Sequence, residues 1–494
     1  ELFDNIATAA IPIIDTFTAQ GLANTVNAFA KVGHSHPELF EKVATVTIPI
    51  IDTFTAQGLA ITVNAFAKTD QPNPELVDNV ARATIKIIDT FASQDLATTV
   101  NAFAKIEQPY PELFEKVAMA SIPIIGTFTA QGLSNTANAF AKTDQSNPEL
   151  FETIATAAIP IISTFTALEL ANTVNAFAKM NQPHPELFKN AARAAIPIIG
   201  TFNAQSLAIT VNAFAKVGYS HTDLFEKVAT AAIPIIDTFN AQGLAITVNA
   251  FAKADKPHQA LFEKVAMAAI PIIDTFNAQE LANTMSAFGR VRMTSDNSKK
   301  LYSRSAEVMV GNTKLQTWSD RNLVEVGYAF MKVRYPNDEL LDTIGSTITS
   351  KTKIELNAQE LGNLAACFNK QKVSSSEKVL QMICDRFQSI DKDTIGLQSI
   401  ADVVSAISMA QQLHVCSPTM LKFVINLAIT KSNESRPQDV CDILLGFDRA
   451  SIPDDLRRDL LLAYMPYFNQ YSTDLSHTNC MKICKIYDES DITV

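Results

Sequence analysis

ELFDNIATAAIPIIDTFTAQGLANTVNAFAK, which occupies residues 1–31, decides the fold because it recurs along the chain. It returns as ELFEKVATVTIPIIDTFTAQGLAITVNAFAK at residues 38–68. Each copy begins 37 residues after the one before it, without an insertion or a deletion, at Glu1, Glu38, Glu75, Glu112, Glu149, Glu186, Asp223 and Ala260. A fixed period of this length is typical of repeat architectures, in which one supersecondary unit is stacked many times.

Each copy predicts two helices joined by a turn. The first opens with a sequence such as Asn73-Pro74-Glu75, which combines an N-cap residue, a proline at the first helical position and an acid in the first turn. Helical spacing in the second copy predicts one apolar face made of Leu39, Val43, Val46 and Ile50. The second helix is expected to follow Thr18 as its cap and to end at Lys31.

A proline recurs near the end of the first helix in seven of the eight copies. The positions are Pro12, Pro49, Pro123, Pro160, Pro197, Pro234 and Pro271, and the third copy has Lys86 there. An interior proline removes a helical hydrogen bond and collides with the preceding turn. We therefore predict a kink or an early end of the first helix at these prolines.

Beyond Arg290 the identity between copies fades, but the spacing of the helices persists. We predict eight near-identical repeats over residues 1–296 and divergent repeats of about 38–42 residues over residues 297–494, which continue the same stack. The whole chain is then all-α, with about thirteen helical pairs. The predicted fold is an α-solenoid of helix–turn–helix repeats, wound as a right-handed superhelix, in which each layer buries its apolar face against its neighbours.

The second helix of each copy predicts a core face and an opposite polar stripe. The core face of the first copy contains Leu22, Ala23, Val26, Phe29 and Ala30. Gln20, Asn24, Asn27 and Lys31 lie within about 60° of one another on the opposite side. The cation of the stripe recurs at Lys68, Lys105, Lys142, Lys179, Lys216, Lys253 and Arg290, and then at Lys332, Lys370 and Arg449. The amide of Asn27 recurs at Asn64, Asn101, Asn138, Asn175, Asn212 and Asn249, followed by Ser286.

One edge of this stripe varies between otherwise similar copies. It reads Asn24, Ile61, Thr98, Asn135, Asn172, Ile209, Ile246 and Asn283. Helical-repeat RNA binders read about one base per repeat with two or three side chains, and Lys and Arg contact the backbone. The stripe is therefore a candidate RNA-binding track. A solvated face is the alternative, because Lys is favoured at a helix C-terminus and Asn columns can bond to each other between layers.

Composition limits the other classes of function. The 494 residues are 47% hydrophobic and 18% charged, with a net charge of −11, which excludes wholesale disorder. No apolar run approaches the roughly 20 residues that span a bilayer, so we expect no membrane contact. The acidic balance argues against an indiscriminate nucleic-acid coat but allows a local basic track.

No catalytic chemistry is expected. The sequence has no Gly-rich phosphate loop and no His-Glu-x-x-His, and its histidines lie mostly in linkers. Cys480 and Cys484 stand one helical turn apart, which makes half a metal site at most. Six scattered cysteines favour a reducing compartment over a disulfide framework. We expect no enzyme activity, metal or cofactor.

The string Phe276-Asn277-Ala278-Gln279-Glu280-Leu281-Ala282-Asn283-Thr284, followed by Ala287-Phe288, closely resembles the octotricopeptide and heptatricopeptide class of organellar helical-repeat proteins. It is also similar to the RNA-editing substrate-binding complex 6 type of repeat. The resemblance implies an α-solenoid that binds single-stranded RNA in a mitochondrion or chloroplast, where such proteins support transcript stability, processing, editing or translation. Other protein subunits of an RNA-processing complex are further implied partners.

This chain departs from that class in two respects. Many family repeats carry Trp where this chain has Asn27, and no RAP domain is recognisable before Val494. Because Glu1 lies within a repeat, any targeting segment is expected upstream of it. A protein-binding scaffold without nucleic-acid contact remains the alternative function.

Overall fold

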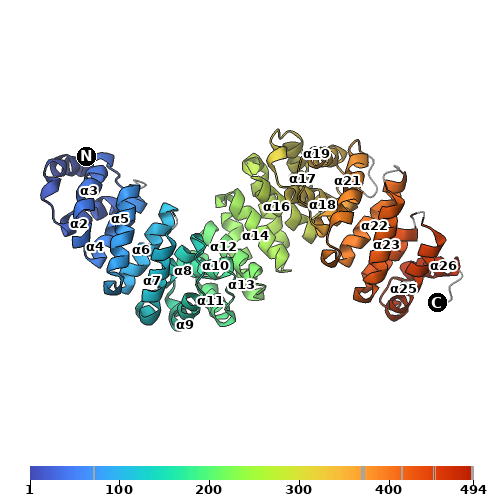
Figure 1. Cartoon of the computed structure of the whole chain (residues 1–494), viewed down its shortest axis with the longest axis horizontal. Coiled ribbons are helices and arrows are strands. Elements are labelled where there is room, and N and C mark those ends of the chain that lie inside the picture. The colour runs from blue at the N-terminus through green and yellow to red at the C-terminus, as the bar shows by residue number, and fades with distance from the viewer. Residues whose placement is uncertain are drawn as a thin grey trace. The chain divides into compact units, whose positions relative to one another are not determined.

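The computed structural model describes residues 1–69, 73–108, 110–368, 373–412, 416–448, 450 and 452–490. Within these residues the chain forms 26 α-helices and eleven 3₁₀ helices, and no strand (Figure 1). The chain divides into two compact units, of which unit 1 is Glu1–Phe239 with Lys253–His258 and unit 2 is Asn240–Ala252 with Gln259–Val494. The predicted all-α solenoid of helical pairs is confirmed, whereas the division at residue 296 and the superhelical hand remain predictions.

Unit 1 alternates first and second helices. Its first helices are α1 (Leu2–Ala10), α3 (Pro37–Thr47), α5 (Pro74–Lys86), α7 (Pro111–Ser121), α9 (Pro148–Ala158), α11 (Pro185–Ile198) and α13 (Thr222–Ala232). Each continues into a 3₁₀ helix: η1 (Ile11–Thr16), η2 (Ile48–Thr53), η3 (Ile88–Thr90), η4 (Ile122–Thr127), η5 (Ile159–Thr164), η6 (Ile199–Thr201) and η7 (Ile233–Thr238). The second helices are α2 (Ala19–Lys31), α4 (Ala56–Lys68), α6 (Ser93–Ile106), α8 (Ala130–Lys142), α10 (Ala167–Lys179) and α12 (Ala204–Lys216).

Unit 2 continues the alternation with less regular elements. Its helices begin with α14 (Ala241–Lys253), α15 (Gln259–Ala269), α16 (Ala278–Val291), α17 (Asp296–Val310), α18 (Asp320–Lys332), α19 (Asp338–Thr349) and α20 (Ala358–Phe368). They continue with α21 (Ser376–Ser389), α22 (Leu397–Gln412), α23 (Pro418–Thr430), α24 (Pro437–Asp448), α25 (Asp454–Tyr471) and α26 (His477–Asp488). Short 3₁₀ segments are η8 (Ile270–Thr275), η9 (Leu315–Thr317), η10 (Lys392–Thr394) and η11 (Ser432–Glu434).

The helix starts follow the predicted caps. The Thr18 hydroxyl accepts a hydrogen bond from the Gly21 N–H at 3.2 Å, and α2 ends at Lys31. The Asn73 side chain accepts from the Leu76 N–H at 2.9 Å at the start of α5. Each cap satisfies one backbone donor that the first helical turn leaves without an intrahelical partner.

The recurring proline marks a switch from α to 3₁₀ geometry. At Pro12, Pro49, Pro123, Pro160, Pro234 and Pro271 the α-helix ends before the proline, which lies in the first turn of the 3₁₀ helix. Where Lys86 replaces it, α5 runs on to Lys86. At Pro197 the early end is not observed, because this proline lies inside α11, one residue before the helix ends. The alternative at this position, a kink, stays a prediction.

The core lies between the first and second helices. All five predicted core residues of α2 are buried. In α3 the predicted face is only partly right, because Val46 and Ile50 are half-buried. The buried residues of that helix are Leu39, Phe40, Val43, Ala44 and Thr47. Ile50 leaves the face because it lies in η2, where three residues per turn rotate the side chains out of the α-helical register.

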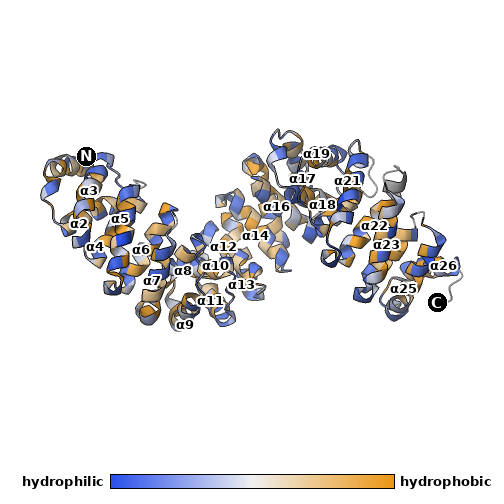
Figure 2. Ribbon diagram, viewed as in Figure 1, coloured by the Kyte–Doolittle hydropathy of each residue, from blue (hydrophilic) through white to orange (hydrophobic). Residues whose placement is uncertain are grey.

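Edge-to-face phenylalanine pairs join the two helices of a layer. The rings of Phe40 and Phe66 lie 5.0 Å apart at 71°, and four further layers repeat the edge-to-face pair at 5.0–5.1 Å. Such a pair contributes about 0.5–1.5 kcal/mol beyond its buried area. Figure 2 shows apolar residues along the helices of both units, as expected when every layer is covered by its neighbours.

The second helices of unit 1 form a continuous row. Each of α2, α4, α6, α8 and α10 packs against the next second helix along the unit (Figure 1). Because the repeats have equal length, equivalent positions of successive second helices come to lie side by side. Their polar stripes therefore form one surface.

Candidate nucleic-acid interface

The predicted stripe residues lie at the surface of this row. Gln20, Asn24 and Lys31 are exposed, and Asn27 is half-buried. The equivalent lysines are exposed in every regular copy: Lys68, Lys105, Lys142, Lys179, Lys216 and Lys253, followed by Arg290. The equivalent asparagines are half-buried: Asn64, Asn101, Asn138, Asn175, Asn212 and Asn249. Asn283, on the variable edge, is also half-buried.

A hollow of about 560 Å³ crosses three successive second helices of unit 1. It is lined by Asn64 and Lys68 from α4, by Ser93, Gln94, Ala97, Thr98, Asn101 and Lys105 from α6, and by Gln131, Gly132 and Asn135 from α8 with its N-cap residue Thr129. The structure thus brings the predicted cations, amides and variable edge of neighbouring copies around one depression. Its lining is largely polar, and its cations all come from the lysine column.

The glutamines of this lining extend the sequence prediction, which singled out Gln20 alone. Exposed glutamine recurs at the same position in six other copies: Gln57, Gln94, Gln131, Gln205, Gln242 and Gln279. Only the fifth copy departs, with Leu168. The 37-residue period therefore already contained the signal for a third polar column.

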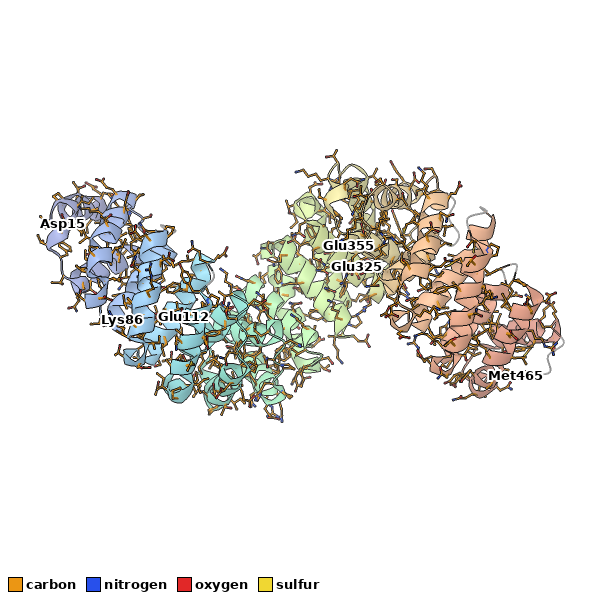
Figure 3. The ribbon with its side chains drawn as sticks, in the orientation of Figure 1. Asp15, Lys86, Glu112, Glu325, Glu355 and Met465 are labelled. Carbon is orange, nitrogen blue, oxygen red and sulfur yellow. The ribbon has the colours of Figure 1, made fainter. Side chains whose placement is uncertain are left out.

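The lysines of the stripe are largely unpaired. In the described part of the chain, Lys31, Lys68, Lys105, Lys179 and Lys216 form no ion pair, and Lys142 lies 3.0 Å from Glu107. Lysines of the first helices differ, since Lys42 pairs with Asp15 at 3.3 Å and Lys86 with Asp52 at 3.0 Å. Figure 3 labels one member of each of these ion pairs, Asp15 and Lys86. Within the described residues, five of the six stripe lysines on α2–α12 therefore carry positive charge that no ion pair neutralises.

Neighbouring cations of the stripe are close enough to affect one another. Desolvation lowers the pKa of Lys105, and repulsion from Lys68 and Lys142 lowers it further. Three ammonium groups from successive layers thus share one electrostatic environment. A polyanion laid along the row would relieve this repulsion by placing a negative charge between the cations.

Charge is divided between the two rows of helices in unit 1. Over α1–α12 with η1–η6, the second helices carry six lysines and two acids, for a net charge of +4. The first helices with their 3₁₀ segments carry thirteen acids and six basic residues, for a net charge of −7. The overall acidity of the chain therefore coexists with a basic face.

The asparagine amides of unit 1 are not used by the fold. Within the described residues, the side chains of Asn27, Asn64, Asn101, Asn138, Asn175 and Asn212 form no hydrogen bond with protein. Among the described stripe residues, an amide ladder is found in unit 2, where Asn249 Nδ2 donates to Asn283 Oδ1 at 3.2 Å and Gln279 Nε2 donates to the same oxygen at 3.1 Å. A structural ladder therefore accounts for Asn249 and not for the unit 1 column.

The stripe changes character along unit 2. Lys332 is half-buried, whereas Lys370 and Arg449 lie outside the described residues. The variable edge carries an acid at Glu325 on α18, which pairs with Arg321, and again at Asp402 on α22 and Asp442 on α24. Burial raises the pKa of Asp402 to about 7 and also raises the pKa of Asp442. The described C-terminal helices thus do not continue the basic column.

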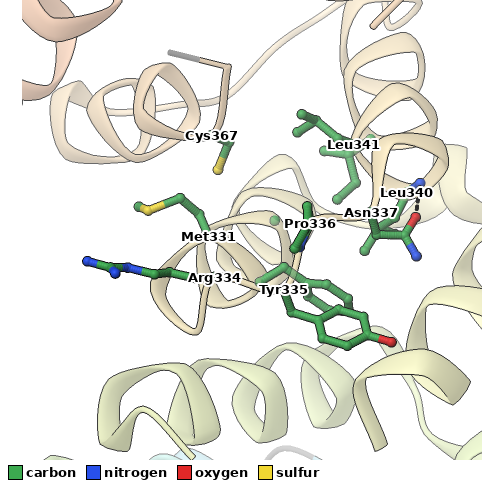
Figure 4. A pocket seen from close by; sticks show the side chains of 11 residues that line it. Met331, Arg334, Tyr335, Pro336, Asn337, Leu340, Leu341 and Cys367 are labelled. Carbon is green, nitrogen blue, oxygen red and sulfur yellow. Dashed lines mark hydrogen bonds between the residues drawn. The ribbon is translucent and has the colours of Figure 1, made fainter. Parts of the chain in front are cut away.

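An apolar pocket of about 290 Å³ lies on a different part of unit 2 (Figure 4). Met331, Tyr335, Leu341 and Cys367 contribute to its wall. Burial raises the pKa of Cys367 to about 12, so its thiol stays protonated at neutral pH. The pocket brings no activated nucleophile to the surface.

Among the residues whose placement is described, no three or more His, Cys, Asp and Glu side chains are grouped to hold a metal ion. The described helices include none with the length and apolar character needed to cross a membrane.

The sequence matches a family profile described as RNA-editing substrate-binding complex 6 protein. The matches cover residues 1–152, 113–229 and 145–354, which together exceed half of the chain. The chain belongs to this family. It is a helical-repeat protein, as the regular hairpins of both units show. A search of curated proteins found no match.

Solved structures that match this chain have low sequence identity to it and low TM-scores. Yeast Tom70 is 10% identical with a TM-score of 0.31, and the comparison covers 96% of this chain and 95% of that one. The pentatricopeptide repeat protein PPR10 from maize is 11% identical with a TM-score of 0.24, covering 98% and 93%. A homology model of the full-length AP-3 complex is 9% identical with a TM-score of 0.28, covering 99% and 85%.

Proposed function

We propose that the second-helix row of unit 1 binds single-stranded RNA. The observation that carries this proposal is the coincidence of two columns, unpaired lysines and amides without protein partners, around one hollow across successive repeats. The lysine column alone has a structural explanation, because Lys is favoured at a helix C-terminus. Together the two columns offer phosphate contacts and base-edge contacts at the same spacing.

The two columns have different roles in this proposal. The lysine ammonium groups contact phosphates and position the strand without reading its sequence. The half-buried asparagine amides can both donate to and accept from a base edge, which suits them to recognition. Asn, Ile or Thr at the variable edge then changes the preference from layer to layer, as in helical-repeat proteins that read about one base per repeat.

The family name supports the setting of this activity. We propose that the chain works in an RNA-editing or related RNA-processing complex, beside other protein subunits and without catalysing a reaction itself. We further propose an organelle, a mitochondrion or a chloroplast, as its site of action, because the family is linked to RNA editing.

A second function, docking of a protein subunit, is favoured by one observation in unit 2. Asp402 and Asp442 replace the neutral residues of the variable edge and are partly desolvated. Such carboxylates oppose a phosphate backbone and suit a basic protein segment. RNA and protein would then contact different helices of the same chain.

The RNA proposal is tested by a charge-matched pair of variants. The first changes Lys68, Lys105, Lys179 and Lys216 to Ala, which removes four unpaired stripe cations. The control changes Lys42, Lys86, Lys116 and Lys189 to Ala, which removes the same charge from the first helices. Affinity for a pool of single-stranded RNAs is measured at several salt concentrations.

The stripe variant should lower the slope of log Kobs against log salt by up to about 2.8, since each phosphate contact on a single strand contributes about 0.7. The control should keep the wild-type slope. Equal losses in the two variants would show that only net charge matters. Absence of RNA binding by the wild type near physiological salt would refute the proposal and leave the protein-docking function.

A further inference from the structure

A second hollow, in unit 2, differs from the one in unit 1 because it contains an aromatic ring. It has a volume of about 530 Å³ and lies where α16, α18 and the start of α20 meet. Its aromatic residue is Tyr328, and its charged lining consists of Arg290, Arg292, Arg321, Glu325, Lys332 and Glu360. We call it the Tyr328 pocket.

Tyr328 occupies the repeat position that holds asparagine in unit 1. Aligning α18 with α2 places Tyr328 at the position of Asn27 and Lys332 at the position of Lys31. The Tyr328 ring is half-buried, and Lys332 Nζ lies 4.8 Å from its centroid. The ring thus already attracts a cation to its π system. A flat aromatic surface beside cations is what single-stranded nucleic acids use for base stacking.

Two arginines at the rim are available for an anion. Arg290 and Arg292 are exposed and form no ion pair within the described residues. Arg321 is different, because its Nε lies 2.9 Å from a Glu325 carboxylate oxygen and 3.8 Å from Glu360. The pocket therefore keeps an excess of positive charge after its internal pairs are counted.

A close helix contact brings these groups together. Gly289 occupies the position of Ala30 in the repeat, and a Cβ there would lie 2.8 Å from Ala329 Cα. The missing side chain lets α18 lie directly against α16 at this level. Arg290 follows Gly289 in the chain and Tyr328 precedes Ala329, so the close contact holds the arginine and the tyrosine at one rim.

We propose that the Tyr328 pocket binds one nucleotide of the RNA strand, with its base against the Tyr328 ring and its phosphate between Arg290 and Arg292. This inference rests on the proposed function and adds a stacking position to it. Within unit 2, the next two second helices after α20 present Asp402 and Asp442 at the variable edge. A phosphate carried beyond α20 would meet carboxylates.

The test compares substitutions that separate stacking from charge. Tyr328→Leu removes the ring, Tyr328→Phe retains it, and the double variant Arg290→Gln with Arg292→Gln removes only the rim charges. Each full-length protein is titrated with a mixed-sequence single-stranded RNA at several salt concentrations. Thermal melting followed by circular dichroism checks that each variant folds.

Loss of one stacked base should weaken binding by the Tyr328→Leu variant by roughly 5- to 150-fold without changing its salt slope. Tyr328→Phe should bind within about twofold of wild type, because it retains the aromatic surface. The arginine variant should lower the salt slope by about 0.7, because its two arginines contact one phosphate. Wild-type affinity in Tyr328→Leu, or an equal loss in Tyr328→Phe, would overturn the inference.

The outcomes also separate this inference from the proposed function. If the wild type binds no RNA, the proposed function fails before any variant is compared. If the wild type binds RNA and the lysine variants behave as expected while Tyr328→Leu does not, only the nucleotide pocket is wrong. A poly-glutamate peptide that binds through Arg290 and Arg292 more tightly than RNA would instead assign the pocket to an acidic protein segment.

Discussion

Gly289→Ala tests the helix contact on which the Tyr328 pocket depends. An added Cβ would lie 2.8 Å from Ala329 Cα and 2.9 Å from Ala329 Cβ. Carbon atoms in contact normally stay about 3.5–4.0 Å apart, so the two helices must separate by roughly 0.7 Å or more. Such overpacking costs about 1–3 kcal/mol, offset by about 1 kcal/mol from the better helix propensity of alanine. The net expectation is a loss of up to about 2 kcal/mol.

Gly327→Ala in α18 is the matched control. Its added Cβ would meet only side-chain atoms, Ile344 Cδ1 at 3.4 Å and Cys367 Sγ at 3.6 Å. Helix propensity then dominates, and the free energy of unfolding should rise by about 0.5–1 kcal/mol. The two alanine variants should therefore differ in stability by about 0.5–3 kcal/mol, with Gly327→Ala the more stable.

Urea unfolding combined with hydrogen exchange is the suitable assay, because repeat proteins can unfold in parts rather than in one step. Amides of α16 and α18 should exchange faster in Gly289→Ala and no faster than wild type in Gly327→Ala. Gly289→Ala should also weaken RNA binding, since it moves Tyr328 away from Arg290. The reasoning is refuted if Gly289→Ala is as stable as Gly327→Ala with unchanged exchange in both helices.

Three other predictions concern an ion pair, a buried carboxyl group and two side-chain amides. Lys351→Met should lower the free energy of unfolding of unit 2 by about 3–5 kcal/mol in urea unfolding. The buried Asp320 carboxylate lies 2.7 Å from Lys351 Nζ and would lose its cation. Adding Asp320→Asn should restore much of the lost stability. The pKa of Asp402 is raised to about 7, so between about pH 4 and 7 the folded chain holds a proton that the unfolded chain has released. The free energy of unfolding should therefore fall as the pH rises through this range. Asp402→Asn should flatten the dependence of the melting temperature on pH. Asn101→Ala with Asn138→Ala should change the RNA sequences enriched from a random pool while leaving the melting temperature and salt slope unchanged, because neither amide bonds to protein.

The features predictable from sequence were those fixed within one repeat. Helical period, caps and the core face of α2 depend on neighbours a few residues away, so the pattern from Thr18 to Lys31 was sufficient. The exceptions involve a change of helix type. The position of Ile50 was wrong because the chain turns from α to 3₁₀ geometry before reaching it.

Features that depend on contacts between two layers could not be predicted from the sequence and are seen only in the structure. The sequence showed a lysine at each repeat end but not that Lys142 would meet Glu107 while Lys105 would meet other lysines. It likewise left open whether the asparagines bond to one another. Tyr328 was missed in the sequence because this repeat position was followed only as an asparagine column. Aligning α18 with α2 shows that Tyr328 replaces the asparagine.

The separation of charge between the two rows explains how an acidic chain can present a site for a polyanion. Packed helices lie about 8–10 Å apart axis to axis, and their side chains add to that separation. The Debye length at physiological salt is about 8 Å, so carboxylates of the first helices are largely screened from a strand on the second-helix row. At 0.01 M salt the Debye length reaches about 30 Å, and those carboxylates would then repel the strand. The gain in RNA affinity on lowering salt should therefore level off at low salt, and it should level off less in a variant that lacks acids of the first helices.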